Sequence, residues 1–511
     1  MAIGSRWFRN ALGLGVIAAV NAAPVAKAAN TNTPIKHVVV IFQENESFDH
    51  YFGTYPAALN PPNEPPFFAE PNTPAVNGLT GGLLTKNPNG FNPFRLDRGQ
   101  AATCDQDHDY TPEQQAFDAG LMDQFPQFTG TGNTVSSPCF DYGYGQNLVM
   151  GYYDGNTVTA LWNYAKHYAM SDNFFGTTFG PSTVGAINLI SGQTNGASPA
   201  NESGDTVDGT IIGDPQPTGD TCTTRDNAMM VTGKNIGDLL NAKGISWGFF
   251  QGGFDLTITN PDGSTGCSRT HTSAVTGTKK TDYIPHHQPF QFYASTANLN
   301  HNRPSSVAAI GSTDQANHQY DTHDFFDALA KGNFPAVSIL KAPGYQDGHP
   351  GYSDPLDEQT FVVKTINTIM KTPDWDSTVI FIAWDDSDGW YDHQMGPILS
   401  QSNTADDALT APGSCGKAPE GAAQGRCGYG PRQPFLVISP YAKANFVDHS
   451  VGDQSSIIRF IEDNWNLGRI GNGSSDGVAG SLHKVFDFSG WAGKNDRLCL
   501  DPSSGEPVGC R

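Results

Sequence analysis

The sequence predicts an α/β protein with a mainly parallel central sheet that is flanked by helices. Three observations support this fold class. Short runs of apolar, β-branched residues lack the alternation of a half-exposed strand, which is typical of strands buried on both faces. Segments with apolar residues at helical spacing lie between these runs. Long insertions rich in glycine, proline, asparagine and serine separate the units.

The strands are expected where apolar runs are bounded by turn residues. His37–Phe42 (HVVVIF) and Thr378–Trp384 (TVIFIAW) are continuous apolar runs, so we expect both to be buried strands. The other expected strands are Asp172–Phe175, Ile245–Phe250, Ala336–Leu340 and Phe435–Ser439.

The helices are expected between these strands. Gln359–Lys371 and Ser455–Asn466 carry apolar residues at helical spacing, so each has a face that packs inward. Gly244 and Gly332 end two further helices, because glycine readily adopts the left-handed conformation beyond a helix C-terminus. The expected helices are Thr159–Tyr168, a stretch opened by Ser182, Asn235–Lys243, Asp324–Lys331, Gln359–Lys371 and Ser455–Asn466.

Four long polar insertions interrupt these units and carry five of the eight cysteines. In α/β sheets, ligands bind beyond the carboxyl ends of the strands, where such loops gather. We therefore expect residues 29–511 to form a single domain in which the insertions build the rim of a site. The insertions are Thr54–Gln106, Asn195–Asp226, Gly252–Asp282 and Ser402–Cys427.

The N-terminus has the pattern of a signal peptide over residues 1–28. Arg6 and Arg9 form a basic region, Ala11–Val20 an apolar region, and Ala26-Lys27-Ala28 a small-x-small cleavage site. The apolar region is too short to span a bilayer, and no later run approaches about 20 apolar residues. The sequence therefore predicts a periplasmic or secreted protein without stable membrane insertion.

The eight cysteines agree with export, because disulfides persist in oxidising compartments. No two of them form a C-x-x-C pair, which argues against a zinc or redox motif. Pairing of nearest neighbours along the chain would close four local loops, and it is one of about 105 possible connectivities. The cysteines are Cys104, Cys139, Cys222, Cys267, Cys415, Cys427, Cys499 and Cys510.

The formal net charge of −22 argues against a protein that binds the phosphate backbone of nucleic acid. The expected partner is instead a small substrate, and the composition leaves the oligomeric state open.

Polar side chains follow two of the expected strands directly. Glu44 and Asn45 come just after His37–Phe42, and Asp385 and Asp386 follow Thr378–Trp384. Carboxylate and amide oxygens are ligands for divalent cations of the Mg, Ca or Mn type. Carboxylates packed together would also raise one another's pKa, and a cation resolves that repulsion. We therefore predict one divalent metal site, although each cluster alone would also fit solvated turn acids.

Ser182 follows a Gly-Pro turn and opens a helical stretch. A hydroxyl at a helix N-terminus lies among free backbone N–H groups, which suits an oxyanion or phosphate. The commoner role of such a serine is that of an N-cap. A metal within reach would favour the nucleophile instead, because it lowers the pKa of the hydroxyl.

Several histidines lie in loops beside Asp, Pro or another His, among them His108, His287 and His349. Each alone would be assigned to the surface.

The motifs together resemble the bacterial phosphoesterase family of non-specific phospholipases C and AcpA-type acid phosphatases. The similarity covers residues 36–466 and follows the order of the family's motifs. The matching segments are HVVVIFQENESFDHYFGTYP, GPST…INLISGQT, DYIPHHQPFQFYAST, DGHPGYSDP, FIAWDDSDGWYDH and GPRQPFLVISPYAK…VDHS…SIIRFIEDNW. The resemblance implies an alkaline-phosphatase-like fold with a single metal site.

The resemblance also implies roles for individual residues. Ser182 stands at the position of the family's nucleophile and is also a ligand of the metal. His108, His287 and His349 match the histidines that contact the phosphoryl oxygens and the leaving group, with His286 as the alternative to His287. The remaining implied metal ligands are Glu44, Asn45, Asp385 and Asp386.

The implied activity is hydrolysis of phosphoric esters through a phosphoseryl intermediate. Phospholipase C members more often read Asp-Glu where this chain reads Asp385-Asp386, and longer members carry C-terminal β-domains beyond the helix at Ser455–Asn466. Both departures favour an AcpA-type acid phosphatase, and a phospholipase C acting on phospholipid head groups is the alternative.

Two other functions are compatible with parts of the sequence. Gly244-Ile245-Ser246-Trp247-Gly248 fits the G-x-S-x-G pattern of serine acyl hydrolases, but there a strand should precede the serine and a helix follow it. A non-catalytic exported protein could use the acidic clusters to hold structural Ca²⁺, which would leave the Gly-Pro-Ser182 turn unexplained.

Overall fold

The computed structural model describes residues 1–2, 30–131, 139–199, 204–489 and 497–510. The basic, apolar and cleavage regions of the expected signal peptide lie outside these residues, so that expectation stays a prediction. The chain divides into the units Met1–Asn30 and Thr31–Arg511. All helices and strands given below belong to the second unit.

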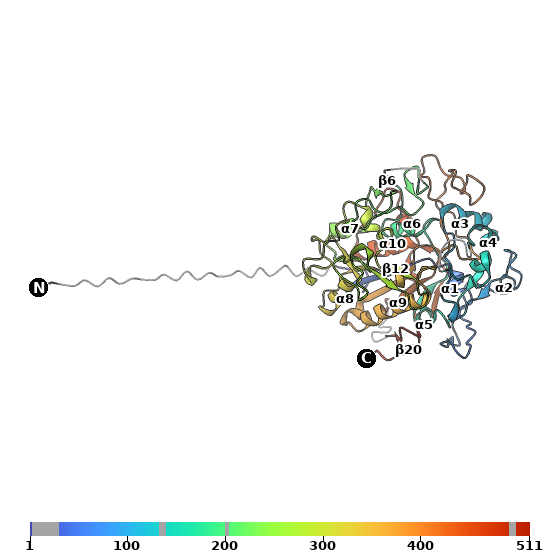
Figure 1. The fold of residues 1–511 in the computed structure, drawn as a ribbon, viewed down its shortest axis with the longest axis horizontal. Coiled ribbons are helices and arrows are strands. Elements are labelled where there is room, and N and C mark those ends of the chain that lie inside the picture. The colour runs from blue at the N-terminus through green and yellow to red at the C-terminus, as the bar shows by residue number, and fades with distance from the viewer. Residues whose placement is uncertain (3–29, 132–138, 200–203, 490–496, 511) are drawn as a thin grey trace. The chain divides into compact units, whose positions relative to one another are not determined.

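An eight-stranded sheet forms the centre of this unit, with the strand order β13-β10-β14-β1-β15-β16-β4-β17 (Figure 1). β16 runs antiparallel to both of its neighbours, and the remaining neighbouring pairs are parallel. The expectation of a mainly parallel α/β sheet is confirmed. Its strands are β1 (His37–Gln43), β4 (Ala169–Ser171), β10 (Trp247–Gln251), β13 (Gln319–Asp321), β14 (Val337–Lys341), β15 (Thr378–Trp384), β16 (Phe435–Ile438) and β17 (Phe446–Asp448).

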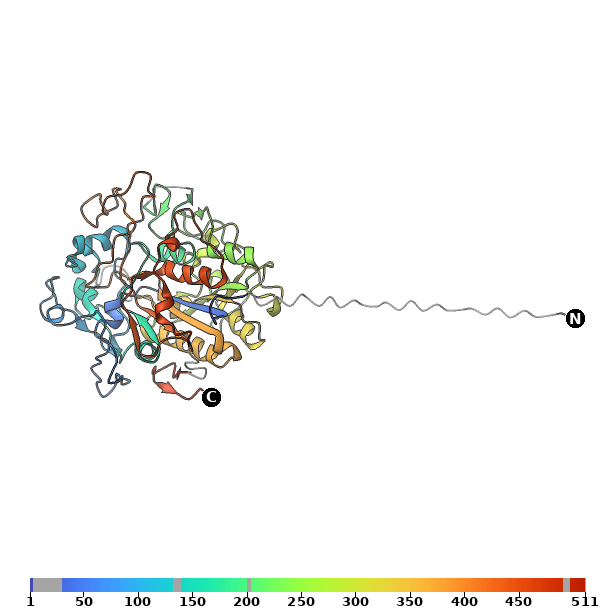
Figure 2. The same ribbon diagram turned by 180° about the vertical axis from the view of Figure 1, so that it is seen from behind.

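Helices cover both faces of the sheet because successive side chains of each buried strand point to opposite faces. Val39 and Ile41 of β1 enter one core, and Val38 and Val40 enter the other. Helices α5, α8 and α9 pack into the first core, and α6, α7 and α10 into the second (Figures 1 and 2). Their bounds are α5 (Thr159–His167), α6 (Ser182–Ser191), α7 (Ile236–Lys243), α8 (Thr322–Ala330), α9 (Pro355–Met370) and α10 (Gln454–Trp465).

The expected strand Asp172–Phe175 is wrong as a member of the central sheet. β4 ends at Ser171, and β5 pairs with β18 in a separate two-stranded sheet. The chain leaves the sheet because the Asp172 carboxylate accepts hydrogen bonds from Asn77 N (2.7 Å) and the His449 ring (2.9 Å). α9 also begins four residues before the expected start, because the Asp354 side chain caps its N-terminus.

The segments outside the central sheet and its flanking helices contain further short elements, and many of them are two-residue strands. The short helices are α1 (Phe48–Phe52), α2 (Gly82–Thr85), α3 (Tyr110–Phe117) and α4 (Phe125–Phe128). The short strands are β2 (Phe94–Arg95), β3 (Gly151–Tyr152), β5 (Phe174–Phe175), β6 (Ala197–Ser198), β7 (Thr206–Val207), β8 (Thr210–Ile211), β9 (Met230–Val231), β11 (Thr270–Thr272), β12 (Lys279–Thr281), β18 (Gly452–Asp453), β19 (Cys499–Leu500) and β20 (Pro507–Val508).

The eight cysteines form four disulfides with the nearest-neighbour connectivity. The pairs are Cys104–Cys139, Cys222–Cys267, Cys415–Cys427 and Cys499–Cys510.

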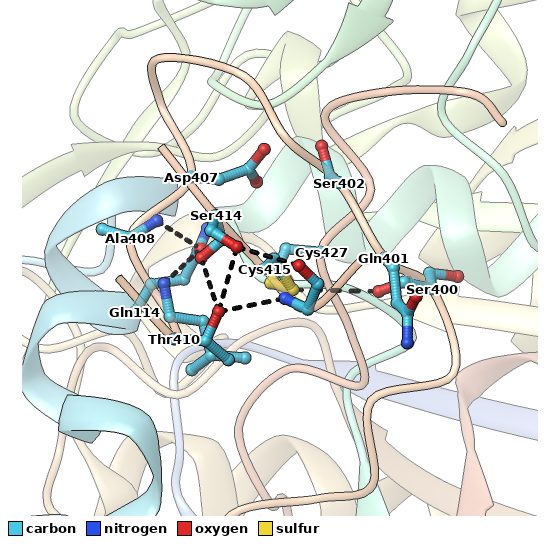
Figure 3. Close-up of a disulfide and its surroundings, with 12 residues drawn as sticks. Gln114, Ser400, Gln401, Ser402, Asp407, Ala408, Thr410, Ser414, Cys415 and Cys427 are labelled. Carbon is cyan, nitrogen blue, oxygen red and sulfur yellow. Dashed lines mark hydrogen bonds between the residues drawn. A yellow bond between two sulfur atoms is a disulfide. The ribbon is translucent and has the colours of Figure 1, made fainter. Parts of the chain in front are cut away.

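The insertion Ser402–Cys427, which contains the third disulfide, is also fastened to α3. Gln114 Oε1 accepts hydrogen bonds from Ala408 N (2.9 Å) and Leu409 N (3.1 Å) (Figure 3). Tyr110 Oη accepts one from Cys427 N (2.9 Å). The loop therefore holds α3 in place beside the candidate site.

Within the described residues, no helix combines the length and the apolar character that a bilayer span requires.

Candidate active site

The ends of three adjacent strands supply the centre of the site. Glu44 and Asn45 follow β1, Asp385 and Asp386 follow β15, and Lys341 is the last residue of β14. Because these strands are parallel neighbours, their carboxyl ends lie side by side. Asn45 takes a left-handed conformation (φ 65°), which asparagine tolerates, and its backbone N donates to Asp385 Oδ1 at 3.0 Å.

Ser182 reaches these carboxylates from the first position of α6. Its hydroxyl donates to Glu44 Oε2 (2.9 Å) and also lies 3.2 Å from Asp386 Oδ2. Pro181 is the N-cap residue of α6, so the hydroxyl of Ser182 is not used as a cap. The left-handed Gly180 (φ 121°) turns the chain just before Pro181.

A close approach of α6 to the β15 loop brings the hydroxyl this near. A Cβ atom added to Gly185 would lie 2.1 Å from the backbone oxygen of Asp385. Glycine at this helical position therefore permits a separation that any side chain would prevent.

The three expected histidines border the same centre. His287 Nδ1 lies 3.0 Å from Glu44 Oε1, and His108 Nε2 lies 3.5 Å from Asn45 Nδ2. The ring of His349 lies farther out, with its centroid 6.0 Å from that of His108. His286 packs behind His287, with ring centroids 4.5 Å apart, so the geometry favours His287 of the two.

The histidines differ in charge because their surroundings differ. Burial opposes protonation of His108, but the carboxylates of Asp386 and Asp388 raise its pKa well above the usual value. Burial and the charge of Lys341 lower the pKa of His287 well below it. Burial also lowers the pKa of His349.

Lys341 is a site residue that the sequence reasoning missed. Its ammonium is fully buried, forms an ion pair with Glu44, and lies 3.3 Å from Asp385 Oδ2. It directly follows the expected strand Ala336–Leu340, so the signal that revealed Glu44 and Asp385 was also present here. Asp347 is a second such residue, at 3.9 Å from His287 Nδ1.

Two further carboxyl groups hold the loops around Ser182. Glu113 on α3 accepts from Ser387 Oγ (2.6 Å) and from Gly180 N (3.4 Å), so it joins the β15 loop to the turn before Ser182. Asp388 Oδ1 accepts from Asn45 Nδ2 at 2.8 Å. The sequence pattern did not reveal Glu113, because it does not follow an expected strand and its partners lie 67 and 274 residues away along the chain.

A buried arginine fastens the segment after β1 to the segment after β15. The Arg432 guanidinium is fully buried, with Asp49 Oδ1 at 3.0 Å and Asp392 Oδ2 at 3.1 Å. The two halves of the candidate metal site are therefore held together independently of any ion.

The polar groups fit a divalent cation. Asn45 Oδ1 is buried and has no hydrogen-bond partner among the described residues, so it is an acceptor available to a ligand. Burial and the charge of Glu44 raise the pKa of Asp385 to about 7, despite Lys341. Burial raises the pKa of Asp386 as well. A cation at these oxygens would allow both aspartates to ionise.

Two other groups of possible ligands adjoin this centre. Within each, the ligand atoms lie within 4.8 Å of one another. The groups are Glu44, His287 and Asp347, and Asp105, His108 and His349.

The serine of the acyl hydrolase pattern lies in the reverse of the required context. Ser246 follows α7 and precedes β10, and its Oγ accepts a hydrogen bond from Ala336 N at 3.0 Å. Because a helix precedes Ser246 and a strand follows it, this serine does not lie in a strand-turn-helix elbow.

The fold and the site define an α/β protein with a hydroxyl and several carboxylates gathered at the carboxyl ends of its strands. The chain belongs to the Phosphoesterase family, whose model matches residues 35–468. This confirms the resemblance and supports the expected enzyme class, phosphoric ester hydrolase.

Its curated relatives include three phospholipases C. The non-hemolytic phospholipase C of Pseudomonas aeruginosa is 24% identical, with 93% of this chain and 60% of the relative covered. Phospholipase C A of Mycobacterium tuberculosis is 23% identical, with 89% and 78% covered. The non-specific phospholipase C6 of Arabidopsis thaliana is 24% identical, with 85% and 69% covered. The chain thus spans about three fifths of the length of the Pseudomonas relative.

Among solved structures, the matches include a protein of the alkaline phosphatase superfamily from Vibrio parahaemolyticus. It is 11% identical, with a TM-score of 0.27, and 61% of this chain and 60% of that chain are covered. Human ectonucleotide pyrophosphatase / phosphodiesterase 5 is also 11% identical, with a TM-score of 0.31, and 65% of this chain and 94% of that chain are covered.

Proposed function

We propose that this protein hydrolyses phosphoric esters, with Ser182 as the nucleophile and a phosphoseryl enzyme as the intermediate. The observation that carries the proposal is the placement of the Ser182 hydroxyl 2.9 Å from Glu44 Oε2 and 3.2 Å from Asp386 Oδ2. A carboxylate at this distance accepts the proton of an attacking hydroxyl.

In the first step, Ser182 Oγ bonds to phosphorus as the bond from phosphorus to the ester oxygen breaks. His287 or His349 gives a proton to the departing alcohol, and the positive charge of His108 offsets the charge on the phosphoryl oxygens. In the second step, a water oxygen attacks phosphorus and loses a proton to the histidine that protonated the alcohol. The bond from phosphorus to Ser182 Oγ breaks, and Ser182 takes back the proton that the carboxylate accepted, which restores the enzyme.

A divalent cation would supply the positive charge that lowers the pKa of the serine hydroxyl and offsets phosphoryl charge. The residues that would hold it are Glu44, Asn45, Asp385, Asp386 and Ser182.

The test is turnover of p-nitrophenyl phosphate by the wild-type protein and by Ser182→Ala. We expect the variant to lose at least about a thousandfold in kcat, because the nucleophile is absent. Mass spectrometry of acid-quenched enzyme should find phosphate on Ser182. Unchanged turnover in the variant would reject the proposal, and a non-catalytic calcium-binding protein would leave Ser182 unmodified.

The metal requirement is tested by chelation of the purified protein. We expect the activity to disappear and to return on addition of Mg²⁺, Ca²⁺ or Mn²⁺, and the most effective ion would identify the class of cation. Full activity after exhaustive chelation would contradict the metal site.

We propose a phosphomonoester as the substrate, as in AcpA-type acid phosphatases. The names of the curated relatives favour a second candidate, phospholipase C activity. Release of phosphocholine from phosphatidylcholine, measured beside phosphate release from p-nitrophenyl phosphate, separates the two activities.

We also propose that the protein is exported to the periplasm or secreted. Its four disulfides support an oxidising compartment. N-terminal sequencing of the protein from the culture medium and the periplasm would test cleavage after residue 28.

A further inference from the structure

Two cationic side chains reach the rim of the site from separate insertions. Arg225 lies in the insertion Asn195–Asp226, and Lys280 lies on β12 in the insertion Gly252–Asp282. The disulfide Cys222–Cys267 joins these two insertions, with a small apolar cluster around Phe254 and Tyr283 beside it. The rim that carries both cations is therefore built as one covalently closed unit.

Lys280 is directed toward the candidate leaving-group histidines. Its stem packs near Gly344, and its Nζ lies 3.5 Å from the centroid of the Tyr352 ring. That ring in turn stacks on His349, with centroids 4.3 Å apart. Tyr352 Oη donates to Asp347 Oδ2 at 3.2 Å, which orients the ring under the ammonium.

The charge of Lys280 is not neutralised by a direct partner. Within the described parts of the chain, Lys280 forms no ion pair with a carboxylate, and Arg225 bonds to the backbone oxygen of Asp214 at 2.7 Å. The neighbouring Lys279, on the opposite face of β12, does pair with Asp262 at 2.9 Å. A half-buried ammonium held over an aromatic ring, without a carboxylate, is suited to an anionic ligand.

The two cations also act on the same part of the site. Burial is the main reason why the pKa values of His286 and His287 are lowered. The charges of Lys280 and Arg225 lower both of them further. Both cations therefore act on the histidines where the alcohol part of a substrate would leave, and the carboxylates of Asp347, Asp105 and Glu44 offset part of the charge of Lys280.

We propose that Lys280, assisted by Arg225, is a specificity-determining residue that selects phosphate esters whose alcohol part carries a second anionic group. The inference rests on the proposed function, since it concerns the leaving-group side of that site. An alcohol with a quaternary ammonium group would be repelled by the same charges, so choline esters would be poor substrates.

The experiment compares kcat/KM for three phosphomonoesters that differ in the charge of the alcohol. These are 3-phosphoglycerate, with a carboxylate, glycerol 3-phosphate, which is neutral there, and phosphocholine, which is cationic. We expect the wild-type protein to prefer 3-phosphoglycerate over glycerol 3-phosphate by about threefold to fivefold, the range for a partly exposed charge pair. The preference should shrink between about 0.05 M and about 0.5 M salt.

Lys280→Met should abolish this preference and raise the relative rate with phosphocholine, whereas Lys280→Arg should keep the preference. Lys279→Met is the matched control, because that ammonium is paired on the other face of the strand, and it should behave as wild type. Arg225→Gln, at an exposed position, should reduce the preference in part and provides a second test if Lys280→Met does not fold. The readout is a ratio within one protein, so a general loss of folded enzyme cancels.

The inference would be overturned if Lys280→Met and wild type showed an equal preference, or if the wild type preferred phosphocholine. In either case, hydrolysis of p-nitrophenyl phosphate would leave the proposed function standing. Failure to hydrolyse the three phosphomonoesters and p-nitrophenyl phosphate would overturn both.

Discussion

Lys341 places a positive charge at the centre of the site without any ion. Its ammonium lies between Glu44 and Asp385, and Lys341 is on β14, which is next to β1, the strand that Glu44 follows. Because all three groups are buried, removal of the ammonium would leave two carboxylates without their nearest compensating charge.

We expect Lys341→Met to lower the free energy of unfolding by about 3 kcal/mol, as for a broken buried pair. The midpoint of urea unfolding measures this, provided that the slope is unchanged. Lys364→Met, at an exposed position of α9, is the control and should stay within about 0.5 kcal/mol. A Lys341 variant as stable as the control would show that the ion pair does not support the site.

The second prediction at this scale concerns pH. Burial lowers the pKa of His349, and the charges of His108 and Lys280 act in the same direction. A general acid must carry its proton, and His349 loses that proton as the pH rises through its depressed pKa. We therefore expect kcat for p-nitrophenyl phosphate to fall as the pH increases from about 5 to about 8.

His349→Gln should flatten this dependence, whereas His483→Gln, at an exposed position away from the site, should preserve it. A wild-type rate that rises throughout this range would contradict the role of His349 as the acid.

At the scale of elements, the site depends on how closely α6 packs against the loop after β15. Gly185 permits this approach, since an added Cβ would lie 2.1 Å from Asp385 O. Glu113 on α3 then fixes both loops from the side.

We expect Gly185→Ala to displace α6 and to reduce kcat by at least about a hundredfold, because small misplacements of a nucleophile are costly. Gly82→Ala is the matched control, because a Cβ there meets open space in α2. Turnover of p-nitrophenyl phosphate is the measurement, with circular dichroism to compare the folds. Equal turnover in both variants would mean that the approach of α6 is not required.

At the scale of the whole molecule, disulfides close loops that differ in length. Cys222–Cys267 closes a loop with a sequence separation of 45, whereas Cys499–Cys510 closes one of 11. In the chain-entropy description, loss of the longer loop costs about 4 kcal/mol and loss of the shorter about 3 kcal/mol.

We therefore expect the double variant Cys222→Ser, Cys267→Ser to have the lower thermal midpoint of the two double serine variants. Calorimetry in non-reducing buffer measures the difference, and a reducing agent should bring both variants and the wild type together. The reverse order would show that native contacts of the C-terminal loop outweigh chain entropy.

Local pattern was enough to predict the main strands and helices and their carboxyl-end clusters. β15 has the bounds expected from its apolar run, and Glu44, Asn45, Asp385 and Asp386 were found because they follow buried strands. Runs of apolar, β-branched residues have few alternatives to a buried strand, so their ends could be located without coordinates.

Long-range placement was beyond the reach of that pattern. The antiparallel direction of β16, the exit of the chain at Asp172 and the support from Glu113 depend on partners far away along the chain. The local pattern alone did not distinguish Ser182 from a helix cap, and the structure shows its hydroxyl beside Glu44 and Asp386. A hydrogen bond across 138 or 204 residues has no local signature, because it arises from the order in which the strands pack.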